Sequence, residues 1–259
     1  MIIDIHEHFG WEEDYLDRLL SAMDEAGIDM ACLSPLPPHF ECPDEDAVMQ
    51  ACEAHPDKLI PFGYLRLGSD GPDWVQDLHD RGFRGLKTHV PPANYDDKRF
   101  YPAYEKAEEL GLPILFHTGI IVARTENDKK FDINSARMRP IFLDAVARAF
   151  PGLNIIAAHL GLPWHMEAAA VTHINPNVYV DLAFGRHHLF AEYDVDYFGK
   201  VFHWKNAWRK VVFGGSHFSH AGWILETRYK QNMEGLHVDG ETQDAVLGNT
   251  LAKMIGLEL

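Results

Sequence analysis

The sequence predicts an α/β fold, a single (β/α)8 TIM barrel that occupies residues 1–259 as one domain. Three observations support this fold. Short apolar runs rich in β-branched residues alternate with longer amphipathic segments, and glycines stand between the two kinds of segment. The chain also has 259 residues, of which 46% are hydrophobic, and its sequence shows no obvious linker between domains. A chain of this length and composition can bury one large core.

The short apolar runs are expected to form the eight parallel strands of the barrel. Each run is rich in Val, Ile, Leu or Phe and is bounded by turn residues. The runs cover residues 2–6, 29–33, 59–65, 83–88, 112–117, 153–158, 177–182 and 210–213.

Helices are expected between the strands, because apolar residues recur there at i, i+3 and i+4. The clearest patterns cover residues 11–26, 44–54, 72–81, 100–110, 140–150 and 164–172. Gly27, Gly82, Gly111 and Gly152 follow four of these patterns, at the position where a glycine in the left-handed conformation ends a helix. The seventh unit is the weakest, since residues 186–208 show no clean helical period.

Composition limits the classes of partner. The chain carries 39 acidic and 23 basic residues, a formal net charge of −16, and so acidic a surface repels nucleic acid. The first residues contain neither a basic segment nor a long apolar stretch, and Cys32, Cys42 and Cys52 form no Cys-x-x-Cys pair. We therefore expect no membrane partner, no disulfide framework and a cytoplasmic protein that acts on a small molecule.

A histidine pair at the end of the first predicted strand is the main functional signal. His6 and His8 are two residues apart, so on a strand both imidazoles project from the same face and can converge on a metal ion. The alternative is coincidence, because 16 of the 259 residues are histidine. The positions of the other histidines decide between the two interpretations.

Histidine recurs where other predicted strands end. His89 follows the fourth strand, His117 ends the fifth, His159 follows the sixth and His217 lies just past the eighth. The carboxyl ends of barrel strands surround one mouth, so residues far apart in sequence meet there. The pattern predicts a metal site with His6, His8 and His117 as ligands, and His159 as a catalytic or ligating group or else a packing residue.

Other polar residues on this frame have two interpretations each. Lys87 points inward on the fourth strand, where a lysine is costly unless it faces an anion, a carboxylate or the pocket. Asp181 ends the seventh strand and is expected to accept hydrogen bonds rather than to act as a base. The long connection 118–139, which contains Arg124 and Arg137, is either part of the active face or a solvated excursion.

Aromatic residues in the predicted loops suggest a pocket that accepts apolar or aromatic groups, although they fit lid packing equally well. They are Phe40, Trp164, Phe184, Trp204 and Trp223.

Several motifs occur in an order and spacing that resemble the amidohydrolase superfamily, and within it the amidohydrolase-related branch that contains decarboxylases and lactonases. The motifs are Asp4-Ile5-His6-Glu7-His8, Gly85-Leu86-Lys87-Thr88-His89, Phe116-His117-Thr118-Gly119, Ala158-His159-Leu160-Gly161 and Leu247-Gly248-Asn249-Thr250. The resemblance implies one divalent metal held by His6, His8 and His117, most often zinc and otherwise manganese. It also implies that His159 acts on the substrate or on bound water.

One position departs from that family. The family usually ends the eighth strand with Gly-Ser-Asp, whereas this chain has Gly214-Gly215-Ser216-His217. His217 can replace the carboxylate as a general base or as a fourth metal ligand. The TatD-type nucleases fit less well, because residues 61–65 lack the glutamate expected on their third strand.

The leading hypothesis is a metal-dependent hydrolase of a small, carboxylate-bearing substrate. In this hypothesis His159 or His217 transfers the proton. Lys87, together with Arg124 or Arg137, binds the substrate carboxylate. His89 and Trp164 line the substrate site. One alternative is a decarboxylase of an aromatic or unsaturated acid, which needs the same ligands. Another is a barrel that binds a metal or ligand but has lost catalysis through His217. The sequence leaves a homodimer open.

Overall fold

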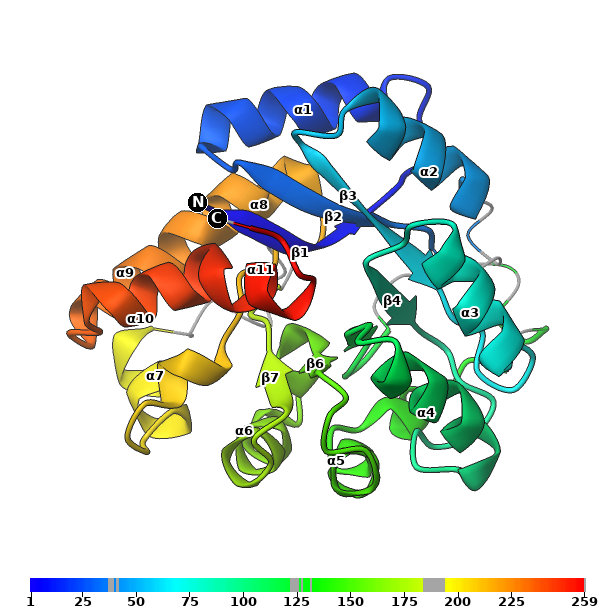
Figure 1. Cartoon of the computed structure of the whole chain (residues 1–259). Coiled ribbons are helices and arrows are strands. Elements are labelled where there is room, and N and C mark those ends of the chain that lie inside the picture. The colour runs from blue at the N-terminus through cyan, green and yellow to red at the C-terminus, as the bar shows by residue number, and fades with distance from the viewer. Residues whose placement is uncertain are drawn as a thin grey trace.

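The computed structural model describes residues 1–36, 40, 42–121, 126, 128–130, 132–183 and 194–258. A seven-stranded parallel sheet, in the order β1-β2-β3-β4-β5-β6-β7, curls through the centre, and helices surround it (Figure 1). Each strand overlaps one of the first seven predicted runs, so the α/β class and the parallel sheet are confirmed. The strands are β1 (Ile3–His8), β2 (Met30–Ser34), β3 (Leu59–Tyr64), β4 (Gly85–Thr88), β5 (Ile114–Phe116), β6 (Ile155–Ala157) and β7 (Val178–Val180).

The predicted eighth strand, residues 210–213, forms only an isolated bridge between Val211 and Val180. A 3-10 helix, η6 (Ala207–Lys210), ends directly before Val211, so only a few residues of this segment are extended and able to form a strand. The segment still lies between β7 and β1, because the Val212 amide donates to the Val180 carbonyl at 2.9 Å and the Ile5 amide donates to the Phe213 carbonyl at 3.0 Å. Eight regular strands are therefore not confirmed.

The six predicted helices are present as α1 to α6, with later starts at α1 and α5, whereas α7 to α11 correspond to none of the six patterns. The helices are α1 (Tyr15–Ala26), α2 (Glu45–Ala54), α3 (Pro72–Asp80), α4 (Tyr101–Glu109), α5 (Phe142–Ala149), α6 (His165–Ile174), α7 (Val195–Val201), α8 (Phe218–Ile224), α9 (Gln231–Gly235), α10 (Gly240–Asp244) and α11 (Thr250–Met254). Two π-helical segments, η7 (Leu225–Lys230) and η8 (Ala245–Asn249), interrupt the final helical stretch. None of the described helices is long and apolar enough to cross a membrane.

Three of the four predicted helix-ending glycines adopt the left-handed conformation: φ is 68° at Gly27, 98° at Gly82 and 68° at Gly111. Gly152 does not. Its amide donates to Glu108 Oε1 at 2.6 Å, and a Cβ there would lie 3.0 Å from the same oxygen. Gly152 therefore contacts α4 instead of ending a helix in the left-handed conformation.

Alternating strand residues face the helices and fill the outer core. Leu33, Leu86, Phe116 and Val180 are fully buried against apolar faces such as that of α1. Burial of a side chain of this kind contributes roughly 1.5–3 kcal/mol. The intervening residues of each strand point inward, which places a second set of side chains inside the curled sheet.

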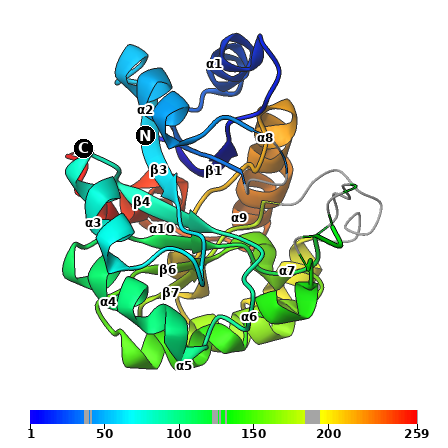
Figure 2. The same ribbon diagram turned by 90° about the vertical axis from the view of Figure 1, so that its right-hand side faces the viewer.

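The backbone is irregular where the strands end. Positive φ values occur at Val90 after β4, at His159 and Leu160 after β6, and at Ser216 after the eighth segment, from 46° at Leu160 to 70° at Ser216. Such conformations are costly for non-glycine residues and cluster at functional sites. In Figure 2, seen at 90° to Figure 1, the helices again pack around the strands.

Candidate metal centre

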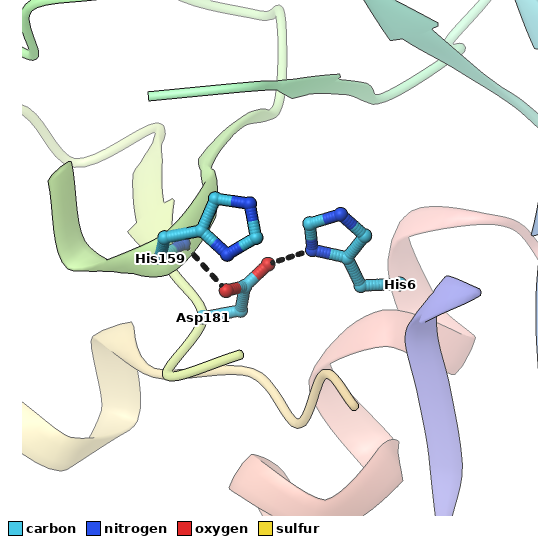
Figure 3. Close-up of side chains that lie close together, drawn as sticks. All are labelled: His6, His159 and Asp181. Carbon is cyan, nitrogen blue, oxygen red and sulfur yellow. Dashed lines mark hydrogen bonds and ion pairs between the residues drawn. The ribbon is translucent and has the colours of Figure 1, made fainter. Parts of the chain in front are cut away.

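The inward face of β1 begins the site with His6, whose side chain is fully buried. Its Nδ1 lies 2.8 Å from Asp181 Oδ2, and the other carboxylate oxygen of Asp181 accepts from the backbone amide of His159 at 2.7 Å (Figure 3). The same oxygen also accepts from the backbone amide of Ala183 at 3.0 Å. Asp181 is thus a hydrogen-bond acceptor, as expected from the sequence. Because His6 donates through Nδ1, its Nε2 carries a lone pair.

His8 is held in the same tautomer by Ser34. Its Nδ1 lies 3.0 Å from Ser34 Oγ, and the Ser34 hydroxyl donates its own proton to the Glu7 carbonyl at 3.2 Å. The Ser34 oxygen must therefore accept from His8 Nδ1, which leaves the lone pair of His8 on Nε2.

The Nε2 atoms of His6 and His8 face each other at 3.1 Å. Two lone pairs at this distance repel unless a cation or a proton lies against both. Nitrogen ligands on a tetrahedral zinc ion, at Zn–N distances of about 2.0–2.1 Å, are about 3.3 Å apart. The pair therefore fits a shared divalent ion.

Lys87 approaches the same lone pair from β4. Its side chain is fully buried, and Nζ lies 3.1 Å from His6 Nε2. Burial lowers the pKa of Lys87 to about 7, although the Asp181 carboxylate acts in the opposite direction. The inward lysine therefore faces the imidazole cluster.

His159 stands between the β1 pair and the histidines of β4 and β5. Its Nδ1 donates to the Ala183 carbonyl, and its ring centroid lies 4.7 Å from that of His6 and 4.9 Å from that of His117. Among the residues that the structure describes, His6, His159 and Asp181 form the group whose potential ligand atoms all lie within 4.8 Å of one another. His159 thus joins the predicted site at its centre.

His117 and His89 complete the cluster. Their ring centroids are 4.0 Å apart, and both side chains are buried. His117 Nε2 has no hydrogen-bond partner although it is buried, so the site leaves one imidazole nitrogen open for a ligand. The potential ligand atoms of His6, His8 and His117 do not all lie within 4.8 Å of one another, so the predicted triad is less compact than expected.

Burial sets the protonation of the site. It lowers the pKa values of His6, His8 and His117 well below their usual range, with the nearby Lys87 acting in the same direction. Burial also lowers the pKa of His159. Neutral imidazoles are the form that binds metal ions, so the cluster is prepared for a cation near pH 7.

His217 and Arg137, which the sequence analysis assigned to the site, make hydrogen bonds to other residues. His217 caps the N-terminus of α8, its Nδ1 accepting from the Ser219 amide at 3.2 Å, and its ring stacks on Phe218 with centroids 4.4 Å apart. Arg137 binds Asp132, with Nη2 2.6 Å from Oδ2.

The structure describes only some of the aromatic and basic loop residues that the sequence placed at the substrate pocket. Trp164 precedes α6 and lies under Arg139, whose Cζ is 5.4 Å from the ring centroid. Phe40 lies near His89, with ring centroids 6.4 Å apart. Arg124 and Phe184 fall outside the described residues.

Two polar residues of the site were not singled out from the sequence. Asp4 is buried and accepts from the amides of His6 at 2.8 Å and Gly215 at 2.9 Å, and burial raises its pKa to about 7. Period-two spacing did not identify it, because the β1–β2 register shifts between Asp4 and Glu7 and breaks the alternation that would relate Asp4 to His6. Ser34 depends on the β1–β2 register, which pairs it with His8 and cannot be read from the sequence.

Solved structures resemble the chain over nearly its whole length. An uncharacterized TIM-barrel protein from Bordetella bronchiseptica has a TM-score of 0.74 at 17% identity, covering 98% of both chains. A probable 2-pyrone-4,6-dicarboxylic acid hydrolase from Acinetobacter baumannii, with citric acid bound, has a TM-score of 0.66 at 14% identity, covering 99% of both. Metarhizium anisopliae IDCase has a TM-score of 0.63 at 15% identity, covering 100% of this chain and 98% of that one. At these identities the likeness shows the fold.

No curated protein matches the chain. The family model described as Amidohydrolase matches residues 3–216, which include β1 to β7 and every histidine of the buried cluster. This match covers most of the 259 residues, and the chain therefore belongs to the amidohydrolase family.

Proposed function

We propose that the chain is a metal-dependent hydrolase that acts on a small, carboxylate-bearing substrate. The observation that carries the proposal is the 3.1 Å separation of the His6 and His8 Nε2 atoms, each with its lone pair toward the other. His6 and His8 would hold the ion, and His117 offers a further imidazole nitrogen, because its buried Nε2 has no hydrogen-bond partner. A divalent ion, zinc or else manganese, supplies Lewis acidity toward a substrate carbonyl when it is bound.

His159 is the group that we assign to proton transfer. Its Nδ1 donates to the Ala183 carbonyl, so Nε2 is free to take a proton from the attacking water and to return it to the leaving group. His217 is the less suitable candidate, because its Nδ1 is engaged in capping α8 and its ring is stacked on Phe218.

Lys87 is the cation that we assign to the substrate carboxylate. It is fully buried beside His6, so its charge acts at low dielectric, whereas Arg137 is already paired with Asp132. The Acinetobacter baumannii hydrolase, named for a dicarboxylic acid and crystallised with citric acid, supports an acidic substrate class.

A decarboxylase is the second candidate, and the end of the eighth segment favours it. Gly214-Gly215-Ser216-His217 offers no carboxylate there to take a proton from water. Decarboxylation instead needs a donor to the carbanionic carbon, and Lys87 or His159 in its protonated form can supply that proton.

One set of assays separates these functions from a binding protein without catalysis. Metal-stripped and zinc-replete protein are compared for hydrolysis of carboxylated lactones and amides, and for release of carbon dioxide from aromatic and unsaturated acids. Metal-dependent hydrolysis supports the proposal, and metal-dependent carbon dioxide release selects the second candidate. Tight zinc binding with neither activity identifies a binder, and turnover unaffected by chelation refutes the metal-dependent mechanism.

A further inference from the structure

Buried tyrosine hydroxyls hold the main chain at the site histidines. The Tyr64 hydroxyl donates to the His89 carbonyl at 2.8 Å, and the Tyr95 hydroxyl donates to the His117 carbonyl at 2.6 Å. Tyr15 contacts the His8 carbonyl in the same way, although it shares its single proton with Glu7 Oε1. Tyr64 and Tyr95 are the clearer cases, because each has one acceptor.

The positions of the two carbonyls explain why a side chain is needed. β4 ends at Thr88 and β5 ends at Phe116, so His89 and His117 lie one residue beyond their strands. Sheet hydrogen bonds fix the backbone up to the last paired residue, and a buried carbonyl beyond it needs another partner. The chain turns away at once after His89, since Val90 has a φ of 51°.

Both tyrosines come from rigid parts of the fold. Tyr64 is the last residue of β3 and is 3% exposed, and Tyr95 is fully buried, with its ring centroid 4.9 Å from that of Phe116. A packed tyrosine ring has few accessible rotamers, so its hydroxyl has a nearly fixed position. That position fixes the carbonyl, and with it the direction in which the neighbouring imidazole leaves the backbone.

We propose that Tyr64 and Tyr95 are positioning residues that set the placement of His89 and His117, and through His117 the affinity of the centre for its metal. The affinity part rests on the proposed function. Partners that hydrogen-bond a ligating side chain change metal affinity or activity by about 10–100-fold, and we expect a bond to the main chain of a ligand residue to act at the lower end of that range.

Tyr104 supplies a matched control. It is fully buried, and its hydroxyl donates to the Tyr95 carbonyl at 3.1 Å. Tyr104→Phe therefore loses the same kind of bond, but at Tyr95 rather than at a histidine. In Tyr64→Phe and Tyr95→Phe the ring remains and only the hydroxyl is removed.

The experiment measures zinc dissociation constants by competition with a chromophoric chelator, and the visible spectrum of the cobalt-loaded protein. We expect Tyr95→Phe to weaken zinc binding by about tenfold and to change the cobalt spectrum, and Tyr104→Phe, which acts only through Tyr95, to have a clearly smaller effect on both. Equal effects in Tyr95→Phe and Tyr104→Phe, or no effect in either, would overturn the affinity part.

The imidazole NMR signals of the metal-free protein test the positioning directly. Tyr64→Phe should shift the His89 signals and Tyr95→Phe the His117 signals, whereas Tyr104→Phe should shift the His117 signals less than Tyr95→Phe does. If wild-type protein binds no zinc, the proposed function fails and these signals alone decide the positioning role. Unmoved His89 and His117 signals in their own variants would refute it.

Discussion

His6 Nε2 lies 3.1 Å from His8 Nε2, while each imidazole is hydrogen-bonded through Nδ1 on its far side. Asp181 and Ser34 thereby select the tautomers that direct two lone pairs to one point. Neither neighbour is next to the histidines in sequence, so the folded sheet creates this arrangement.

Asp181→Asn should weaken zinc binding by about 10–100-fold, because an amide cannot accept from His6 Nδ1 as strongly as the carboxylate does. Competition with a chromophoric chelator measures the effect. Asp144→Asn is the control, since Asp144 binds Arg148 and Asn175 on the outer helices. Equal zinc affinities for Asp181→Asn and the wild type would contradict the role given to Asp181.

Lys87 should make the stability of the metal-free protein depend on pH. Burial lowers its pKa to about 7 in the folded protein, whereas lysine in an unfolded chain titrates near 10.4. Between these values the unfolded chain binds a proton that the folded protein lacks. The unfolding free energy therefore rises with pH, by up to about 1.4 kcal/mol per unit.

Urea unfolding of wild-type protein and of Lys87→Met, both in chelator, from pH 7.5 to 9.5 isolates this contribution. The wild type should gain stability relative to Lys87→Met as pH rises, because the variant has no amine to titrate. Parallel profiles for the two proteins would mean that Lys87 keeps an ordinary pKa.

His159 and His217 should differ in their effect on turnover. Loss of a proton-transfer group costs roughly 10²–10⁴-fold in kcat, so His159→Gln should fall in this range. His217→Asp should change kcat by less than about tenfold, because aspartate caps α8 as the imidazole does. The comparison uses the substrate identified in the assays above, and the reverse order of effects would move the proton transfer to His217.

Gly215→Ala should destabilise the protein by about 1–3 kcal/mol, because a Cβ there would lie 2.4 Å from Asp4 Oδ2 and 2.6 Å from Ala221 Cβ. Gly240→Ala is the control, since nothing lies within 4 Å of the corresponding Cβ in α10. Urea unfolding of both variants gives the comparison. Wild-type stability in Gly215→Ala would show that the end of the eighth segment has room to move.

The fold was predictable because its signals are local. Strands such as Ile155–Ala157 are apolar runs, and Gly27, Gly82 and Gly111 end their helices in the left-handed conformation. The eighth strand was overestimated because Val211–Phe213 looks like a strand, while the η6 turn before it and the glycines after it restrict it to a bridge. The sequence pattern shows that a segment is apolar, but it does not show how many of its residues remain extended and able to pair with neighbouring strands.

The site was predictable as a set of histidines and less so in its geometry. Period-two spacing identifies His6 and His8, and strand ends identify His89, His117 and His159. The sequence could not show that His159 lies between His6 and His117, because the strand tilt and the positive φ at His159 set that placement. The link from Ser34 to His8 likewise depends on register.

The most direct test of the account is a zinc titration of chelator-treated protein, with the bound metal measured by elemental analysis. The account predicts one equivalent bound to the wild type, and binding at least 100-fold weaker in both His6→Ala and His8→Ala. No zinc bound to the wild type, or unchanged affinity in the two variants, would contradict it.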